Sequence, residues 1–180
     1  MNVTEEVLLR ATISLADQIS SYLYETNRVL KAIELSKEQL FLLDHKTLKN
    51  AEKELFVSSK LQAYVIIFHG YFLTNQMGLA IDPGKKLLDL TRQNNLRKAE
   101  GIVSLVLAQC YEHYYDFNKA KEFGLKALSI VTETGRKELE RDCYAFLARI
   151  SLTLGENVTA KEYSNRPKNW QEDTHRSHML

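Results

Sequence analysis

The stretch from Leu107 to Leu128 holds the two residues of this sequence that come closest to a catalytic pair. Cys110 and His113 are three residues apart, about one helical turn, and a cysteine beside a histidine base can act as a nucleophile. The surrounding pattern is that of an amphipathic helix, in which a buried thiol near a surface histidine is ordinary. We therefore predict that the chain is not an enzyme, and we keep this pair as the catalytic alternative.

No other residues in the sequence form a complete motif for metal, nucleotide or cofactor binding. The histidines lack both the HExxH pattern and a CxxC partner; they are His45, His69, His113, His175 and His178. The run from Asp82 to Lys86 would place two lysines at a helix N-terminus, which favours anions, yet it lacks the glycine spacing of a phosphate loop. The sequence predicts no cofactor and no metal.

The composition favours a helical protein with no overall field for a charged partner. The chain has 180 residues, a net charge of +1, 7 Gly and only 2 Pro, which suits one helical domain or a short repeat array. This balance predicts neither nucleic-acid nor membrane binding. The apolar run 63–73 is too short to cross a bilayer, and the first residues do not resemble a secretory signal. We expect a cytoplasmic protein with two buried, reduced cysteines.

Apolar residues at helical spacing predict a succession of helices and no strand. A helix pair is expected in 1–54, with a polar, lysine-rich segment at 44–54 that is either a loop or a helical extension. In the second region, 55–164, we expect Asp82 to cap a helix whose first position is Pro83. The polar segment 165–180 is predicted to be disordered.

The region 55–164 contains an internal repeat. In its register Ala80, Ala120 and Ala160 coincide, and Leu107 falls on Ile67 and Leu147. The predicted repeats are 61–100, 101–140 and a truncated 141–164. An earlier copy in 1–54 fits with a spacing eight residues longer, which the lysine-rich segment would absorb.

The best-preserved copy resembles the tetratricopeptide repeat (TPR). The matching positions are Leu107, Ala108, Tyr111, Ala120, Phe123 and Ala127. The 40-residue spacing and the corner at Gly135 are similar to repeats of the G-protein-signalling-modulator type. The resemblance implies an all-α fold: a right-handed α-solenoid of about four antiparallel helix pairs. Small residues in such pairs let the two helices approach closely, and Tyr111 and Phe123 are expected to fill the gap left between adjacent pairs.

The resemblance also implies a concave groove lined by the first helix of each repeat. Carried over by register, the groove residues are Val65, Ile66, His69, Phe72, Ile102, Leu105, Gln109, Glu112, His113 and Arg149. A largely apolar lining with a few polar groups suits a peptide or amphipathic helix. We therefore expect a non-catalytic adaptor or scaffold with a protein or peptide ligand. Some apolar positions, Val65, Ile66 and Leu105 among them, could instead be buried within the array.

A structural role is the alternative function. The last repeat stops near Ser164 in the repeat register, where the rest of a second helix is expected. The face around Phe146, Ile150 and Tyr163 would then be exposed, and the chain would self-associate through its C-terminal repeat as a fragment of a longer solenoid.

Overall fold

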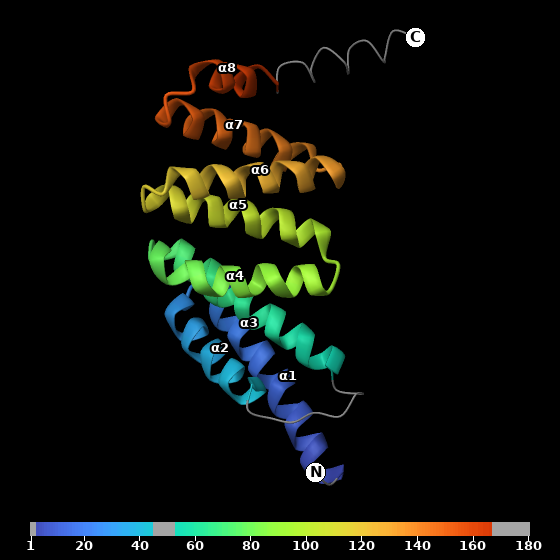
Figure 1. Ribbon diagram of the computed structural model, residues 1–180. Helices are drawn as coiled ribbons and strands as arrows, with labels where there is room; N and C mark the ends of the chain where they lie inside the picture. Colours follow the sequence, from blue (N-terminus) through green and yellow to red (C-terminus); the bar gives the residue numbers. More distant parts are fainter. Residues whose placement is uncertain (1–2, 45–52, 167–180) are drawn as a thin grey trace. The chain divides into compact units, whose positions relative to one another are not determined.

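The computed structural model describes residues 3–44 and 53–166. Within these ranges it contains eight α-helices and no strand, which confirms the all-α prediction (Figure 1). The helices are α1 (Val3–Glu25), α2 (Val29–Asp44), α3 (Lys53–Leu73), α4 (Met77–Gln93), α5 (Arg97–His113), α6 (Phe117–Glu133), α7 (Lys137–Thr153) and α8 (Asn157–Asn165). We call α1, α3, α5 and α7 first helices, and α2, α4, α6 and α8 second helices.

Every described turn between helices contains one residue in the left-handed region. These residues are Asn27, Asn75, Asn95, Tyr115, Gly135 and Gly155. The residue after each returns its amide to the end of the preceding helix, as when Gln76 donates to the Tyr71 carbonyl at 2.8 Å. Such a bond satisfies a helix-terminal carbonyl and reverses the chain within a few residues. The predicted stop at Gly135, with φ of 70°, is one of these turns.

The helix boundaries repeat with the period seen in the sequence. The helices α4, α6 and α8 begin at Met77, Phe117 and Asn157, so each begins one repeat period after the one before it. The left-handed turn residues Asn27 and Asn75 lie further apart than one period, as the longer first copy requires. The extra residues lie partly in 45–52, outside the described residues, and partly in α3, which has 21 residues where α5 has 17. The tail 165–180 was predicted to be disordered, but Asn165 is the last residue of α8; residues 167–180 lie outside the described residues.

The start of α4 corrects one prediction. The helix begins at Met77, and Pro83 lies inside it, so Asp82 is not its N-cap. The repeat register explains the earlier start, because Ala80 is fully buried and sits where Ala120 and Ala160 sit in later second helices. This burial outweighs the one helical hydrogen bond that Pro83 cannot donate. Since Asp82–Lys86 is not a helix N-terminus, the anion site suggested by the sequence loses its basis.

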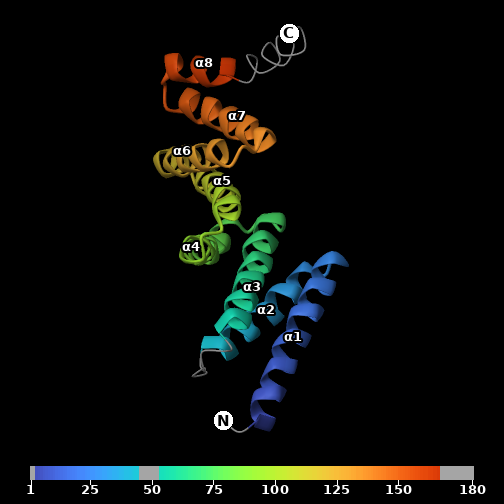
Figure 2. The same cartoon turned by 90° about the vertical axis from the view of Figure 1, so that its right-hand side faces the viewer.

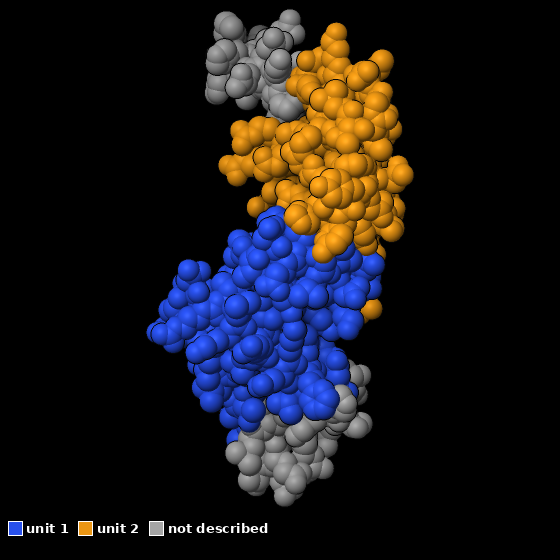
Figure 3. Space-filling model, turned by 90° about the vertical axis from the view of Figure 1, so that its left-hand side faces the viewer, with its two compact units in different colours: residues 1–90 blue, residues 91–180 orange. Residues whose placement is uncertain are grey.

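The chain divides into two compact units, residues 1–90 and residues 91–180 (Figure 3). In unit 1, α2 packs against both α1 and α3, and α1 also contacts α3. Gly70 makes the close approach of α2 possible, because a Cβ atom there would lie 2.9 Å from Ile33 Cδ1. On the other side of α3, the Lys86 ammonium of α4 lies 5.9 Å from the centre of the Tyr64 ring.

Unit 2 contains the best-preserved repeat. Here α6 packs against α5 and α7, α8 packs against α7, and α5 contacts α7. The predicted small residues Ala108, Ala120 and Ala127 are fully buried. Tyr111 stacks on Phe123 with ring centres 5.3 Å apart. The two rings belong to α5 and α6, so they meet within one helix pair and not between adjacent pairs as expected.

The C-terminal repeat differs from the expectation of a bare face. Phe146 and Ile150 are only 2% and 0% exposed. Phe146 packs against α6, where its ring lies 3.0 Å from the position of a Cβ on Gly124. Of the predicted patch, only Tyr163 is partly accessible. The surface assigned to self-association is therefore not formed by Phe146 and Ile150.

Candidate functional site

In each unit, polar contacts join one first helix to the next. In unit 2 the Arg149 guanidinium of α7 donates two hydrogen bonds, of 2.7 and 2.8 Å, to the Glu112 carboxylate of α5. The Arg149 guanidinium also lies 5.3 Å from the centre of the Phe146 ring. The bond to Glu112 raises the pKa of Arg149. This pair keeps two first helices side by side with both charges neutralised.

The predicted groove residues of unit 2 differ in exposure. Ile102 is 38% exposed on α5, His113 is exposed, and Gln109 and Glu112 are half-buried. Leu152, one turn beyond Arg149 on α7, is 58% exposed. Leu105 is only 7% exposed, so it packs inside the unit and offers little to a partner. We call the remaining predicted residues, together with Leu152, the α5/α7 face: Ile102, Gln109, Glu112, His113, Arg149 and Leu152.

The predicted groove residues of unit 1 lie on α3. Val65 is 48% exposed, while Ile66 beside it is only 5% exposed and belongs to the core. His69 is exposed and stacks against Phe72, with ring centres 6.3 Å apart. The Tyr24 hydroxyl of α1 is hydrogen-bonded to Nδ1 of His69. Burial raises the pKa of Tyr24, so its hydroxyl keeps its proton at neutral pH.

A polar network centred on Asp17 joins α1, α2 and α3. The Asp17 carboxylate accepts hydrogen bonds from the Gln39 amide and the Ser59 hydroxyl, both at 2.7 Å. Gln62 donates to the Asp17 carbonyl at 3.0 Å and to the Ser21 hydroxyl at 2.7 Å. The sequence did not reveal this network, because its members come from three helices. Its one visible signal is polar residues at helix positions that are otherwise apolar.

This network borders a shallow hollow of about 370 Å³ on the surface of unit 1. It is lined by Ser14, Asp17, Gln18, Ser21, Tyr22, Glu25 and Gln62. Gln39 is 3% exposed, and its carbonyl oxygen has no hydrogen-bond partner among the described residues. The network fixes how α1 is rotated about its own axis relative to α2 and α3.

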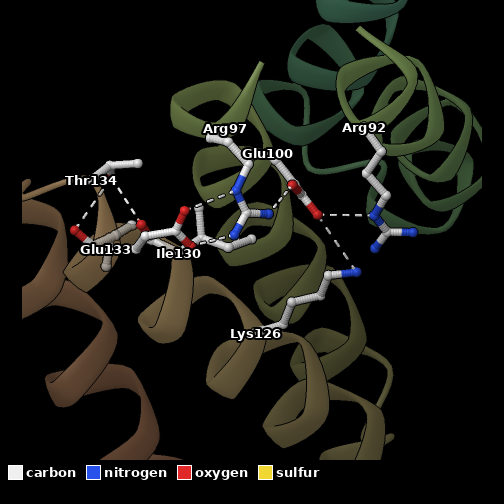
Figure 4. Close-up of polar contacts among 8 residues, drawn as sticks. Arg92, Arg97, Glu100, Lys126, Ile130, Glu133 and Thr134 are labelled. Carbon is white, nitrogen blue, oxygen red and sulfur yellow. Dashed lines mark hydrogen bonds and ion pairs between the residues drawn. The ribbon is translucent and has the colours of Figure 1, made fainter. Parts of the chain in front are cut away.

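A second charged cluster surrounds Glu100 at the start of α5 (Figure 4). Glu100 is 3% exposed and bonds Arg92 at 2.9 Å and Arg97 at 2.6 Å. Arg97 also bonds Glu133 at 2.5 Å, so the cluster ties α5 to the end of α6. One repeat later, Glu140 is 4% exposed and bonds Lys137 at 3.2 Å. A carboxylate in the first helical turn suits the helix dipole, so we assign these buried glutamates to stability.

The arrangement around Cys110 does not favour the catalytic alternative. The Cys110 side chain is fully buried, whereas His113 is exposed. Among the described residues no group of three or more His, Cys, Asp or Glu side chains is placed to hold a metal. His45, His175 and His178 lie outside the described residues. None of the described helices is both long enough and apolar enough to cross a membrane.

Both thiols are expected to react slowly in the folded chain. Burial raises the pKa of Cys110 to about 11 and that of Cys143 to about 12. A free thiol has a pKa near 8.5, so at pH 8 the thiolate fraction of these buried cysteines is lower than that of a free thiol by about a hundredfold or more. The rate of alkylation by iodoacetamide, measured by mass spectrometry, should be lower by the same factor. Because the folded pKa lies above the unfolded value, stability should also fall as the pH rises above about 9. The same reaction in urea, where the chain is unfolded, is the control. Alkylation of Cys110 in the folded chain as fast as that of free cysteine would support the catalytic alternative.

Scans against protein-family models and curated proteins find no match. Solved structures do match in fold. The apo form of RapI has a TM-score of 0.74 and 12% identity over 88% of this chain. Aspartyl phosphate phosphatase F from Bacillus subtilis has a TM-score of 0.71 and 12% identity over 92% of this chain. The chain spans 42% of the length of each of these two proteins.

A third similar structure covers a comparable length. The TPR-like repeats of a kinesin light chain from Podosopora anserina have a TM-score of 0.52 and 14% identity, covering 93% of this chain and 98% of theirs. Likenesses at these identities concern the fold alone. They confirm the predicted TPR-like helical-repeat architecture.

Proposed function

We propose that this chain is a non-catalytic interaction module that binds a protein segment, either a peptide or an amphipathic helix, on its first-helix faces. One observation carries the proposal. The Glu112–Arg149 pair holds α5 and α7 side by side, and exposed apolar side chains lie beyond it on both helices. Ile102 precedes Glu112 by about three turns, and Leu152 follows Arg149 by about one turn. Apolar anchors beside a few fixed polar groups suit the apolar side of a helix.

The TPR-like fold supports the proposal, since stacked helix pairs form extended binding surfaces. On unit 1, Val65, His69 and Phe72 are proposed to contribute in the same way. The resemblance to repeats of the G-protein-signalling-modulator type concerns their spacing and does not extend to their partners. The grooves of those repeats are rich in Asn and Arg, whereas this face has Arg149 alone among its predicted positions. We propose no cofactor, and neither nucleic acid nor membrane as a partner.

Ile102→Glu is expected to reduce capture of the partner at least tenfold, because a partner that covers Ile102 would have to bury an unpaired carboxylate. The measurement is affinity capture with quantitative mass spectrometry. The matched control is Leu125→Glu on the second helix α6, since Leu125 and Ile102 are 40% and 38% exposed. Circular dichroism should be unchanged in both variants. Capture that survives Ile102→Glu, or that both changes reduce equally, would contradict binding on the α5/α7 face.

A further inference from the structure

A set of equivalent positions is buried on every first helix after α1. These positions are Ala63, Ile67 and Gly70 on α3, Val103, Leu107 and Cys110 on α5, and Cys143, Leu147 and Ile150 on α7. None of these side chains on α5 or α7 is more than 6% exposed. The register is set by the turn residues that follow each helix, Asn27, Asn75, Tyr115 and Gly155.

The equivalent residues of α1 are large, apolar and exposed. Leu15, Ile19 and Tyr22 are 56%, 42% and 61% exposed. We call Leu15, Ile19 and Tyr22 the α1 stripe. In Figure 2, α2 and α3 lie to one side of α1, which stands at the edge of unit 1.

The rotation of α1 about its axis cannot be relaxed to hide the stripe. Its opposite side holds Ile13 and Ser20, which are 4% and 0% exposed. On that side too, the Asp17 carboxylate is held by Gln39 of α2 and Ser59 of α3, each at 2.7 Å. Turning α1 inward would break these bonds and leave a carboxylate unsatisfied. The contacts with α2 and α3 therefore keep the stripe on the side of α1 that faces away from them.

On α3 and on α7, a second helix from the preceding pair covers these positions. On α3, Val29 and Ile33 of α2 lie within 3.0 Å of the position of a Cβ on Gly70. On α7, Phe146 and Leu147 lie 3.0 Å from the position of a Cβ on Gly124 of α6. In both places one of the two helices has a glycine where they come closest. Because α1 has Tyr22 at the place of Gly70, the small residue must come from the covering helix.

We propose that the α1 stripe binds an amphipathic α-helix of a partner protein, seated as α2 is on α3 and as α6 is on α7. The occupant carries apolar residues at helical spacing and a glycine or alanine at its closest approach, as α6 does. Stacking of a second copy end to end is disfavoured, because the α8 positions that correspond to Phe117, Lys121 and Gly124 of α6 are Asn157, Lys161 and Ser164, which are polar and exposed. This site is made by residues of unit 1 and the α5/α7 face by residues of unit 2, and the proposal extends the proposed function.

The test uses a labelled synthetic peptide with the α6 sequence, Phe117–Glu133, and the whole chain. Fluorescence anisotropy should show binding that weakens at least tenfold in Leu15→Glu and in Ile19→Glu. The matched control is Leu30→Glu on α2, because Leu30 is 57% exposed and Leu15 is 56% exposed. The Leu30→Glu chain should bind the peptide as the wild type does. The Ile102→Glu chain should also bind it normally, and this result would distinguish the α1 stripe from the α5/α7 face. A peptide in which Gly124 is replaced by leucine should bind at least tenfold more weakly.

Three outcomes would overturn the proposal, two in the binding assay and one in the measurement of mass. The first two are a wild-type chain that does not bind the peptide and a Leu15→Glu chain that binds it equally well. The third is a concentration-dependent increase in mass by light scattering that Leu15→Glu abolishes, since that result would place a second copy on the stripe.

Discussion

Replacing Leu147 by alanine is expected to lower the free energy of unfolding by about 2–5 kcal/mol. Leu147 is fully buried on α7, and its Cδ2 atom lies 3.0 Å from the position of a Cβ on Gly124 of α6. Truncation removes apolar contacts and leaves a cavity that neighbouring helices fill only in part. In a repeat array, a weakened interface between adjacent helices is not compensated from further along the chain.

Urea unfolding followed by circular dichroism measures this loss. Leu152→Ala is the matched control, because Leu152 lies on the same helix with 58% exposure. It should change the free energy by less than about 0.5 kcal/mol. Equal effects of the two changes would show that α7 does not pack on α6 through Leu147.

Gly124→Val is expected to destabilise the chain by about 1–3 kcal/mol. The Cβ alone would come within 3.0 Å of Leu147 and of the Phe146 ring, and valine adds two methyl groups to it. Valine favours a helix over glycine by only about 0.5 kcal/mol, so overpacking decides the sign. Glu122→Val on the exposed side of α6 is the control for the effect of a branched side chain in this helix.

A double variant makes the prediction sharper. Gly124→Val together with Leu147→Ala should cost less than the sum of the two single changes, because the cavity at Leu147 gives the new methyl groups room. Urea unfolding of the four proteins measures this coupling. Strict additivity would mean that the two residues do not share one packing site.

The packing of unit 2 could be predicted because its signals are local. Ala108, Ala120 and Ala127 belong to a pattern that recurs with the period of the array, and Gly135 ends a helix by a backbone preference of its own. The start of α4 could not be predicted locally. Pro83 and Asp82 together form a strong start signal, and only the burial of Ala80 explains why the helix begins earlier.

The candidate site was predicted less completely than the fold. Val65 and Ile66 are neighbours in the sequence, yet one is 48% exposed and the other 5%. Ile102 and Leu105 differ in the same way, at 38% and 7%. Whether a residue near the border between two helix faces is buried or exposed depends on the angle at which the neighbouring helices pack. The spacing of residues in the sequence does not give this angle. The Asp17 network was not predicted for a related reason. Its hydrogen bonds join residues that are 22 and 42 positions apart in the sequence, so spacing within one helix does not indicate them.

Hydrogen–deuterium exchange with and without the captured partner tests binding on the first-helix faces most directly. The account predicts slower exchange on binding in peptides from α3, α5 and α7, with α4 and α6 unchanged, and loss of the α5 and α7 protection in Ile102→Glu. Protection confined to the second helices α4 and α6, with none on α5 or α7, would contradict it.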